Sequence, residues 1–234
     1  MKLSIITINY NNAKGLEKTI HSVLRQTSKL NENYEYIVID GASTDKSLEI
    51  IRNNNINYIS EPDHGISDAF NKGINHAMGE YLIMLNSGDE FYSDNTVENF
   101  LTESNGNDLY YGSVINSKSN TLVGRQSQNT LPDSIPHQGA FVSRKYCEKF
   151  KYSTQFKIRM DYDFFSRLLK VKNIKIKKLP YIITKYEDGG VSMAIKNRSL
   201  FYAEAVKIDF RDKNPTLLAN IARLIYHRLR NWIQ

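Results

Sequence analysis

The chain has 234 residues, of which 41% are apolar and 24% are charged. This length and composition are typical of a soluble globular protein with one large domain, or with one domain and an appendage. The net charge of +6 favours an anionic partner, such as a nucleotide, a nucleic acid or an acidic lipid. The single cysteine, Cys147, excludes an internal disulfide and fits a reducing compartment.

No stretch of the chain predicts a membrane span or a secretion signal. None of its apolar runs approaches the roughly 18 residues that a membrane-spanning helix requires. The apolar run near the N-terminus covers only residues 3–8, and no small-residue cleavage site follows it. We therefore expect a cytoplasmic protein.

Strands and helices alternate over about the first 90 residues. Asn12, and either Thr44 or Asp45, can cap helices after the first two strands, and a third helix is predicted over residues 66–77. Such alternation predicts an α/β fold with a doubly wound, mostly parallel sheet and helices on both faces. The predicted strands cover residues 2–8, 34–40, 56–60 and 81–85.

Polar residues follow each of these strands. They form the clusters 9–12, 40–45, 61–68 and 86–89. The carboxyl ends of parallel strands meet at one edge of a sheet, and open α/β folds bind their ligands there. We therefore expect these clusters to come together at a nucleotide site.

The strand 81–85 ends in the most informative of these clusters, Asn86-Ser87-Gly88-Asp89. Asp89 has another acid, Glu90, beside it, so the local field favours a cation. A ligand that brings its own oxygens, such as a diphosphate, would complete the coordination of that cation. The alternative is a solvated turn after a strand.

The second half of the chain lacks this alternation of strands and helices. A helix is predicted at 94–101, a hairpin from 109–115 and 121–125, and a strand at 137–142. A helix over residues 160–171 opens with Asp161, and a strand follows at 174–179. This half is more plausibly the acceptor side of a site than a second nucleotide fold.

The C-terminal residues differ again. After Asn214-Pro215, residues 215–234 combine a broad apolar face with arginines and contain no acid. A basic amphipathic helix of this kind can lie on an anionic membrane, or it can pack on the protein or on a second subunit.

The chain lacks a Gly-x-Gly-x-x-Gly sequence after the first strand and a Walker lysine motif. Its strand-end motifs instead resemble those of the inverting family 2 glycosyltransferases with the GT-A fold. The order and spacing match that family across residues 1–195, and the branch it most resembles makes bacterial surface polysaccharides (the colanic-acid transferase type). The motifs are SIITINYN at 4–11, VIDGASTD at 38–45, AFNKG at 69–73 and NSGD at 86–89.

The resemblance implies a role for individual residues. Asp161 corresponds to the catalytic base and Asp89 to the last metal-binding aspartate, which would hold Mn²⁺ or Mg²⁺. His137 and Gln138 are expected on the acceptor side, although His137 could instead pack in the core. The implied ligands of the nucleotide sugar are Thr7, Asn9, Asp40, Ser43, Asp68, Ser87 and Asp89.

The sequence departs from the family pattern at three positions. Asn86 stands at the first acidic position of the metal motif, and Gly88 replaces its penultimate aspartate. Metal dependence is therefore expected to be weaker than the family norm. Phe70 replaces an arginine that commonly contacts the nucleotide.

The resemblance implies transfer of a sugar from a nucleoside-diphosphate sugar to a hydroxyl of a glycan or of a polyprenyl-diphosphate-linked acceptor. Residues 1–105 would bind the donor, 106–195 would form the acceptor and catalytic-base half, and 196–234 a basic amphipathic helical extension. The extension could place a cytoplasmic enzyme on the inner face of the membrane.

Three alternatives remain open. Asn86 and Gly88 would also suit a non-catalytic nucleotide- or sugar-binding module, in which Asp161 is only an acid favoured by the helix dipole. A glycosidase would need paired carboxylates, and Asp161 and Asp163 point to different faces of their helix. Nucleic acid would explain the charge, but no motif supports it, so we expect no nucleic acid partner.

Overall fold

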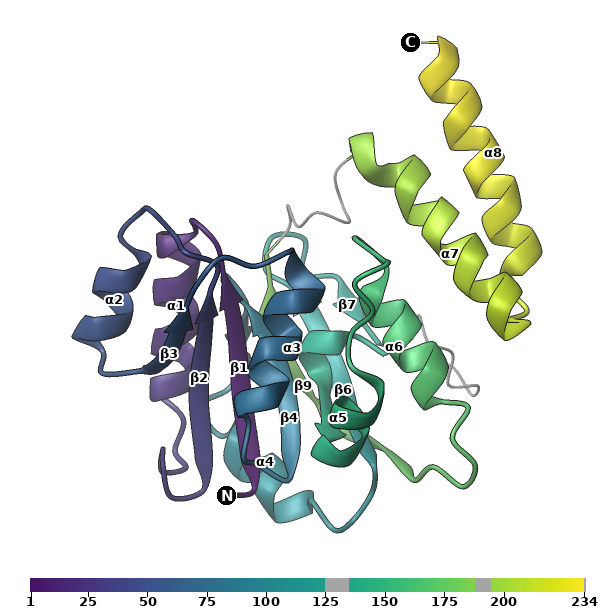
Figure 1. Cartoon of the computed structure of the whole chain (residues 1–234). Coiled ribbons are helices and arrows are strands. Elements are labelled where there is room, and N and C mark those ends of the chain that lie inside the picture. Colours follow the sequence, from purple (N-terminus) through teal and green to yellow (C-terminus); the bar gives the residue numbers. More distant parts are fainter. Residues whose placement is uncertain (125–134, 188–194, 234) are drawn as a thin grey trace.

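A computed structural model describes residues 1–124, 135–187 and 195–233 of the chain. The first half has the alternating order that the sequence predicts (Figure 1). Its strands are all parallel, in the spatial order β3-β2-β1-β4. Its elements are β1 (Leu3–Asn9), α1 (Ala13–Leu24), β2 (Tyr34–Asp40), α2 (Ser47–Asn53), β3 (Asn57–Ser60), α3 (Ile66–His76) and β4 (Tyr81–Asn86).

The register of these strands aligns their polar ends. Asn9 of β1 pairs with Asp40 of β2, and Asp40 pairs with Ser60 of β3. On the other side of β1, Ile8 pairs with Asn86 of β4. The polar clusters therefore begin at the same level along the sheet.

The second half continues the same sheet with mixed strand directions. Strand β8 pairs antiparallel with β4, and β6, β9 and β5 follow in that order, with β7 beside β6. The remaining elements of this half are β5 (Glu90–Phe91), α4 (Thr96–Glu103), β6 (Leu109–Asn116), β7 (Leu122–Val123), η2 (His137–Gly139), β8 (Ala140–Ser143), α5 (Arg144–Phe150), α6 (Met160–Leu168) and β9 (Ile176–Tyr186). Residue 125 of the predicted hairpin lies outside the described residues.

One prediction for this half is wrong. The strand expected over 137–142 begins only at Ala140, because His137–Gly139 form a 3₁₀ turn. Pro136 has no N–H to give to a strand ladder, and its carbonyl instead accepts the N–H of Gly139 at 3.0 Å. The turn carries the side chain of His137 to the end of β4, where it approaches Asn86.

Helices cover both faces of the sheet, as predicted. Side chains alternate along each strand, so Ile5 contributes to one core and Ile6 to the other. Helices α1, α2 and α4 pack on the Ile5 side, and α3, α5 and α6 pack on the Ile6 side. Gly73 lets α3 lie close to β1, since a Cβ there would come within 2.4 Å of Ile6.

The C-terminal region is a pair of helices. Helix α7 (Arg198–Asp212) follows the short turn η3 (Ile195–Asn197), and α8 (Leu217–Ile233) returns along α7 beyond the end of the sheet (Figure 1). We call α7 and α8 together the C-terminal hairpin. No helix in the described part of the chain is long and apolar enough to cross a bilayer.

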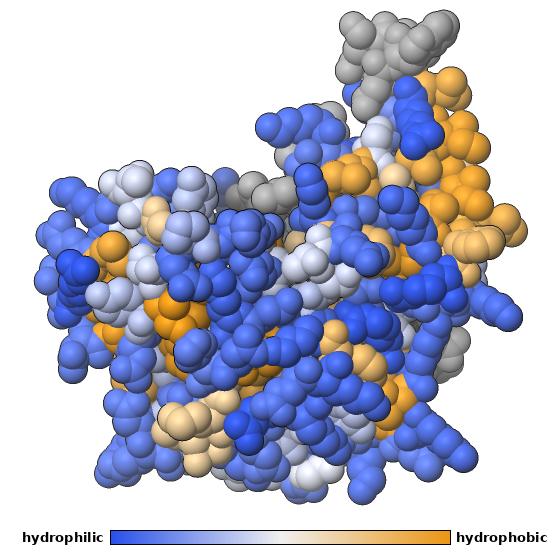
Figure 2. All heavy atoms as spheres, in the orientation of Figure 1, coloured by the Kyte–Doolittle hydropathy of each residue, from blue (hydrophilic) through white to orange (hydrophobic). Residues whose placement is uncertain are grey.

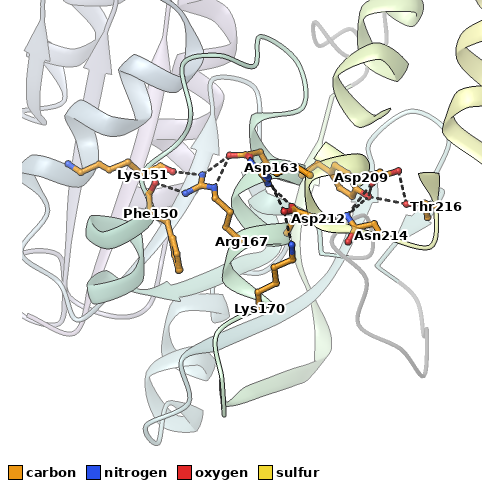
Figure 3. A network of polar contacts seen from close by, with 12 residues as sticks. Phe150, Lys151, Asp163, Arg167, Lys170, Asp209, Asp212, Asn214 and Thr216 are labelled. Atoms are coloured by element: carbon orange, nitrogen blue, oxygen red, sulfur yellow. Dashed lines mark hydrogen bonds and ion pairs between the residues drawn. The ribbon is translucent and has the colours of Figure 1, made fainter. Parts of the chain in front are cut away.

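Buried acids hold the C-terminal hairpin against α6 through hydrogen bonds and ion pairs (Figure 3). Asp209 of α7 is fully buried and accepts hydrogen bonds from Tyr162 of α6 and from Asn214, Thr216 and Asn220 of the hairpin. Asp163 of α6 forms an ion pair with Arg211 of α7, and Lys170, just after α6, forms one with Asp212 of α7. The hairpin is therefore held by polar contacts as well as by apolar packing.

We predict that Asp209→Ala lowers the free energy of unfolding by about 3 kcal/mol, because several buried donors lose their acceptor. Urea denaturation of the full chain measures the change. Asp94→Ala is the control: its side chain is 57% exposed and makes only a surface ion pair with Arg25, so its effect should stay within about 0.5 kcal/mol. Equal denaturation midpoints for wild type and Asp209→Ala would contradict the prediction.

Candidate active site

A hydrogen-bond network joins the carboxyl ends of the parallel strands. The side-chain amide of Asn9 donates to Asp40 at 2.9 Å and to Ser43 at 3.2 Å. Ser87 donates to the side-chain oxygen of Asn9 at 2.9 Å. Asp40 also accepts the hydroxyl of Ser60 at 2.8 Å and the N–H of Ser43 at 3.0 Å. Polar residues from all four parallel strands or their ends thus meet at one edge of the sheet.

A cavity of about 490 Å³ opens above this network. One wall comes from the strand ends and from the start of α3, and the other from the 3₁₀ turn, the segment before α6, and α7. Of the predicted site residues, Asn9, Ser87, His137 and Asp161 line the cavity.

The other predicted site residues do not line the cavity. Asp40 and Thr7 are fully buried, and Thr7 accepts the hydroxyl of Tyr36 at 3.1 Å. Asp68, on the first turn of α3, accepts the N–H of His64 at 3.0 Å. The main-chain oxygen of Gln138 accepts the hydroxyl of Thr184 at 3.0 Å. Ser43 is 9% exposed and is held in the strand-end network.

The turn after β4 places Asp89 beside the cavity. The Asp89 carboxyl accepts the N–H of Asn86 at 3.0 Å, and the N–H of Asp89 donates back to the Asn86 carbonyl. Gly88 has φ +110°, a conformation that side-chain-bearing residues rarely adopt, so this turn requires glycine. Burial raises the pKa of Asp89 to about 6, although the positive charge of His137 and the Asn86 N–H oppose this shift.

His137 connects the strand ends to Asp161. Its Nδ1 lies 3.7 Å from Asp161 Oδ2, and its Nε2 lies 3.1 Å from the side-chain nitrogen of Asn86. If Nδ1 carries the proton, it faces the carboxylate and Nε2 accepts from Asn86. The ring of Phe70 packs edge-on against His137, with centroids 6.2 Å apart. The residue that replaces the family arginine therefore helps to orient the imidazole.

The electrostatics of this pair favour an ionised Asp161. Burial alone would raise the pKa of Asp161, but the adjacent imidazole of His137 and its charge, the charge of Arg159 and the N–H of Tyr162 lower it below its usual value. Burial would lower the pKa of His137, but Asp161 and then Asp89 outweigh it and raise that pKa. Asp161 is thus a carboxylate at neutral pH, and its side chain is 35% exposed.

Two residues that the sequence did not single out shape the same wall. Glu204 of α7 is 3% exposed and accepts the backbone N–H groups of Lys157, Ile158 and Arg159 at 2.8, 3.0 and 2.9 Å. The guanidinium of Arg159 lies between the rings of Tyr162 and Phe201, 4.2 and 4.4 Å from their centroids. In the sequence, Glu204 could have been noticed as an acid on the apolar side of a helix.

Comparison with known proteins decides the family. The sequence model of "Glycosyl transferase family 2" matches residues 4–177. The chain belongs to glycosyltransferase family 2. It is 27% identical to a PGL/p-HBAD biosynthesis glycosyltransferase of Mycobacterium bovis BCG, over 98% of this chain and 90% of that protein. It is 30% identical to an uncharacterised glycosyltransferase of Mycobacterium tuberculosis, over 70% and 68% of the two chains.

Solved structures confirm the GT-A fold of this glycosyltransferase. Staphylococcus aureus TarS (residues 1–349) in complex with UDP-GlcNAc superposes with a TM-score of 0.72, at 18% identity over 96% of this chain and 70% of TarS. The mannosyltransferase PcManGT of Pyrobaculum calidifontis, in complex with GDP-Man and Mn²⁺, gives 0.70 at 16% identity over 97% and 73% of the two chains. At these identities the likeness shows the fold alone.

The metal that the family implies can be tested against the donors of this glycosyltransferase. No cluster of three or more His, Cys, Asp or Glu side chains suited to a metal occurs among the described residues. Around the turn after β4 the donors are the carboxyl of Asp89, the amide of Asn86 and the imidazole of His137. This set fits a divalent cation that also takes oxygens from a diphosphate, with Asp89 as its protein carboxylate.

We predict that Asp89→Asn removes the gain in nucleoside diphosphate affinity that Mn²⁺ provides, because the amide still accepts the Asn86 N–H but lacks the charge that holds the cation. Titration of UDP, GDP and dTDP by calorimetry, with Mn²⁺ or with EDTA, measures this gain. Glu90→Gln removes a neighbouring acid and is the matched control, which should keep the metal effect. An equal Mn²⁺ effect in Asp89→Asn and wild type would rule out Asp89 as the ligand.

Proposed function

We propose that the chain is an inverting transferase that moves a sugar from a nucleoside-diphosphate sugar to a hydroxyl of a glycan or lipid-linked acceptor. We assign it to bacterial surface polysaccharide assembly, in the colanic-acid transferase-like branch. One observation carries this proposal: the ionised carboxylate of Asp161 lies on the wall of the cavity that faces the strand ends. The nucleotide sugars bound to TarS and to PcManGT support a donor of this class.

In this proposal residues 1–105 bind the donor. Asn9 and Ser87 contact it directly from the cavity wall. Asp40, which we expect near the base, holds Asn9 and Ser43 in place through its hydrogen bonds, and Thr7 supports β1 from beneath. Asp68 contributes near the nucleoside from the first turn of α3.

Residues 106–195 supply the catalytic base. Asp161 takes the proton of the acceptor hydroxyl as its oxygen attacks the anomeric carbon from the face opposite the diphosphate, and this attack inverts the anomeric centre. His137 orients the Asp161 carboxylate and, with Gln138, belongs to the acceptor side. A Mn²⁺ or Mg²⁺ ion held by Asp89 would neutralise charge on the leaving diphosphate.

We predict that Asp161→Asn lowers turnover by about 100- to 10,000-fold, because the amide keeps the shape of the side chain but cannot accept the proton. A nucleotide-release assay over UDP-, GDP- and dTDP-sugars with a panel of sugar acceptors identifies the donor and measures turnover. Calorimetry should show that Asp161→Asn binds the nucleoside diphosphate within about twofold of wild type.

Glu148→Gln, at an exposed acid of α5, is the control and should keep full turnover. Turnover at the wild-type rate in Asp161→Asn would remove this residue from the mechanism. A donor screen without any nucleotide release by the wild type would instead favour the non-catalytic binding module.

We also propose that the C-terminal hairpin places the enzyme on the inner face of the cytoplasmic membrane. Residues 196–234 contain eight lysines and arginines but only three acids, Glu204, Asp209 and Asp212. The side chains of all three acids are at most 5% exposed. The exposed charge of the hairpin is therefore entirely basic, which complements an anionic lipid surface.

Apolar side chains share this surface. Figure 2 shows them along the outer side of α8. The large exposed ones, from 54% to 79% exposed, are Phe210, Leu218, Ile225, Tyr226 and Leu229. An exposed apolar patch beside basic residues is typical of helices that lie in the headgroup region of a bilayer.

We predict that the full chain sediments with phosphatidylglycerol vesicles at low salt and less so as salt rises, because salt screens the basic side chains. Changing Leu218, Ile225 and Leu229 together to Ser should weaken this binding by more than about tenfold. Met78→Ser with Val123→Ser, at exposed apolar positions elsewhere, is the control. A wild-type dimer that these three changes dissociate, or vesicle binding that they leave unaltered, would contradict the membrane role.

A further inference from the structure

Glu204 of α7 does not line the cavity, but it binds the segment that leads to Asp161. We propose that Glu204 is a positioning residue of the active site, whose carboxylate fixes the backbone of residues 157–159 and thereby the place of Asp161. This inference rests on the proposed transferase function, in which Asp161 takes the proton of the acceptor hydroxyl. It gives the C-terminal hairpin a part in turnover that is separate from contact with a membrane.

The segment depends on Glu204 for its backbone hydrogen bonds. Residues 157–159 lie between α5 and α6 and belong to no helix or strand. Their N–H groups donate instead to the Glu204 carboxylate, at 2.8 Å from Lys157, 3.0 Å from Ile158 and 2.9 Å from Arg159. Glu204 is 3% exposed, and hydrogen bonds to a buried carboxylate are among the stronger ones in proteins. Three such bonds to consecutive residues fix where this backbone lies.

Helix α7 also holds the segment through a side chain. Phe201 stands three residues before Glu204, so the two residues lie on the same face of α7. Its ring packs on the guanidinium of Arg159, 4.4 Å from the ring centroid, and the ring of Tyr162 lies 4.2 Å from the same guanidinium. The segment is thus enclosed between α7 and the first turn of α6.

The position of this segment determines that of Asp161. Asp161 is the second residue of α6, and its carboxylate accepts the N–H of Tyr162 at 2.7 Å. His137, whose Nδ1 lies 3.7 Å from that carboxylate, belongs instead to the turn near the end of β4. Movement of the segment would therefore shift Asp161 relative to His137 and to the strand ends. A displacement of about 1 Å in an active site can lower the rate about 100-fold.

Glu35 offers a matched control because it makes the same kind of contact in another part of the sheet. It is the second residue of β2, at the opposite end of that strand from Asp40, and it is 3% exposed. Its carboxylate accepts the backbone N–H groups of Met78 and Gly79 and the hydroxyl of Ser4. Alanine at position 35 or at position 204 therefore leaves three donors without their acceptor, so both changes should lower stability.

The experiment compares the full-length wild type with Glu204→Ala, Glu204→Gln and Glu35→Ala. Nucleotide release gives kcat and the KM of the donor, and calorimetry with UDP, GDP or dTDP and Mn²⁺ gives the affinity for the nucleoside diphosphate. Urea denaturation gives the stability of each variant. Hydrogen–deuterium exchange of the backbone N–H groups of residues 157–159 tests the contact itself and requires no reaction.

We expect Glu204→Ala to lower kcat by about tenfold or more, with the donor KM and the nucleoside diphosphate affinity within about twofold of wild type. Its N–H groups at 157–159 should exchange faster than those of wild type. Glu204→Gln should fall between the two, because one amide oxygen can still accept part of the three bonds. Glu35→Ala should lower the denaturation midpoint about as much as Glu204→Ala but keep the wild-type kcat.

Three results would overturn the proposal. The first is a wild-type value of either kcat or the exchange rate in Glu204→Ala. The second is a loss of kcat in Glu35→Ala as large as in Glu204→Ala, since lower stability would then explain both. The third is a loss in Glu204→Ala that consists only of weaker nucleoside diphosphate binding.

If Glu204→Ala does not fold, Glu204→Gln decides by the same criteria. Failure of this proposal leaves the loss of turnover in Asp161→Asn intact. Failure of the transferase function is instead seen as wild-type turnover in Asp161→Asn or as no turnover by the wild type, so the two failures are distinguishable.

Discussion

A buried carboxyl group needs hydrogen-bond donors for its oxygens. Three buried acids of the chain, Asp40, Glu204 and Asp209, obtain these donors from other groups of the protein. Asp40 binds groups from the ends of three strands, and Glu204 binds three consecutive backbone N–H groups. Asp209 binds side chains of α6, of the turn between α7 and α8, and of α8. Each of these acids therefore links segments that are distant in sequence. Asp161 differs because its side chain is partly exposed and faces the cavity, so its carboxylate can still accept a proton.

The structural acids also set the position of Asp161. Glu204 fixes the backbone just before α6, and Asp163, one turn into that helix, is bound by Arg167 and Arg211. Asp161 lies between these two anchors. The C-terminal hairpin supplies Glu204 and Arg211, so a region that the sequence presents as an appendage determines the geometry of the Asp161 carboxylate.

The sequence predicts the first half of the fold well because the relevant signal is local. The mostly apolar runs of β1 and β2 reflect burial on both faces of the sheet, and the apolar spacing along α3 reflects burial of one helix face. Helix α7 escaped prediction as a separate element because its buried face carries Glu204 and Asp209, which interrupt the apolar periodicity. Their partners lie before and within α6, in the turn after α7 and in α8, and no pattern within α7 reveals these partners.

The candidate site likewise combines residues that local motifs predict with contacts that only the folded sheet creates. Family motifs predicted Asp161 and Asp89 as site residues, whereas His137 was predicted near the site from its neighbours Pro136, Gln138 and Gly139. The turn at Pro136 brings His137 near Asp89. Motifs could not show that Asp40 has three donors, because Asn9 and Ser60 approach it only through strand pairing. Pairing of residues 20 or more positions apart is a property of the sheet and not of any segment.

The two walls of the cavity carry different charges. The strand-end wall offers neutral Asn9, Asn86 and Ser87, with Asp89 beside them, so a diphosphate placed there needs a cation to offset the repulsion of that acid. The opposite wall carries Arg159 and Lys157, whose charges are part of the protein. In the proposed reaction a donor bound at the strand ends would present its anomeric carbon to the carboxylate of Asp161, which also lines the cavity.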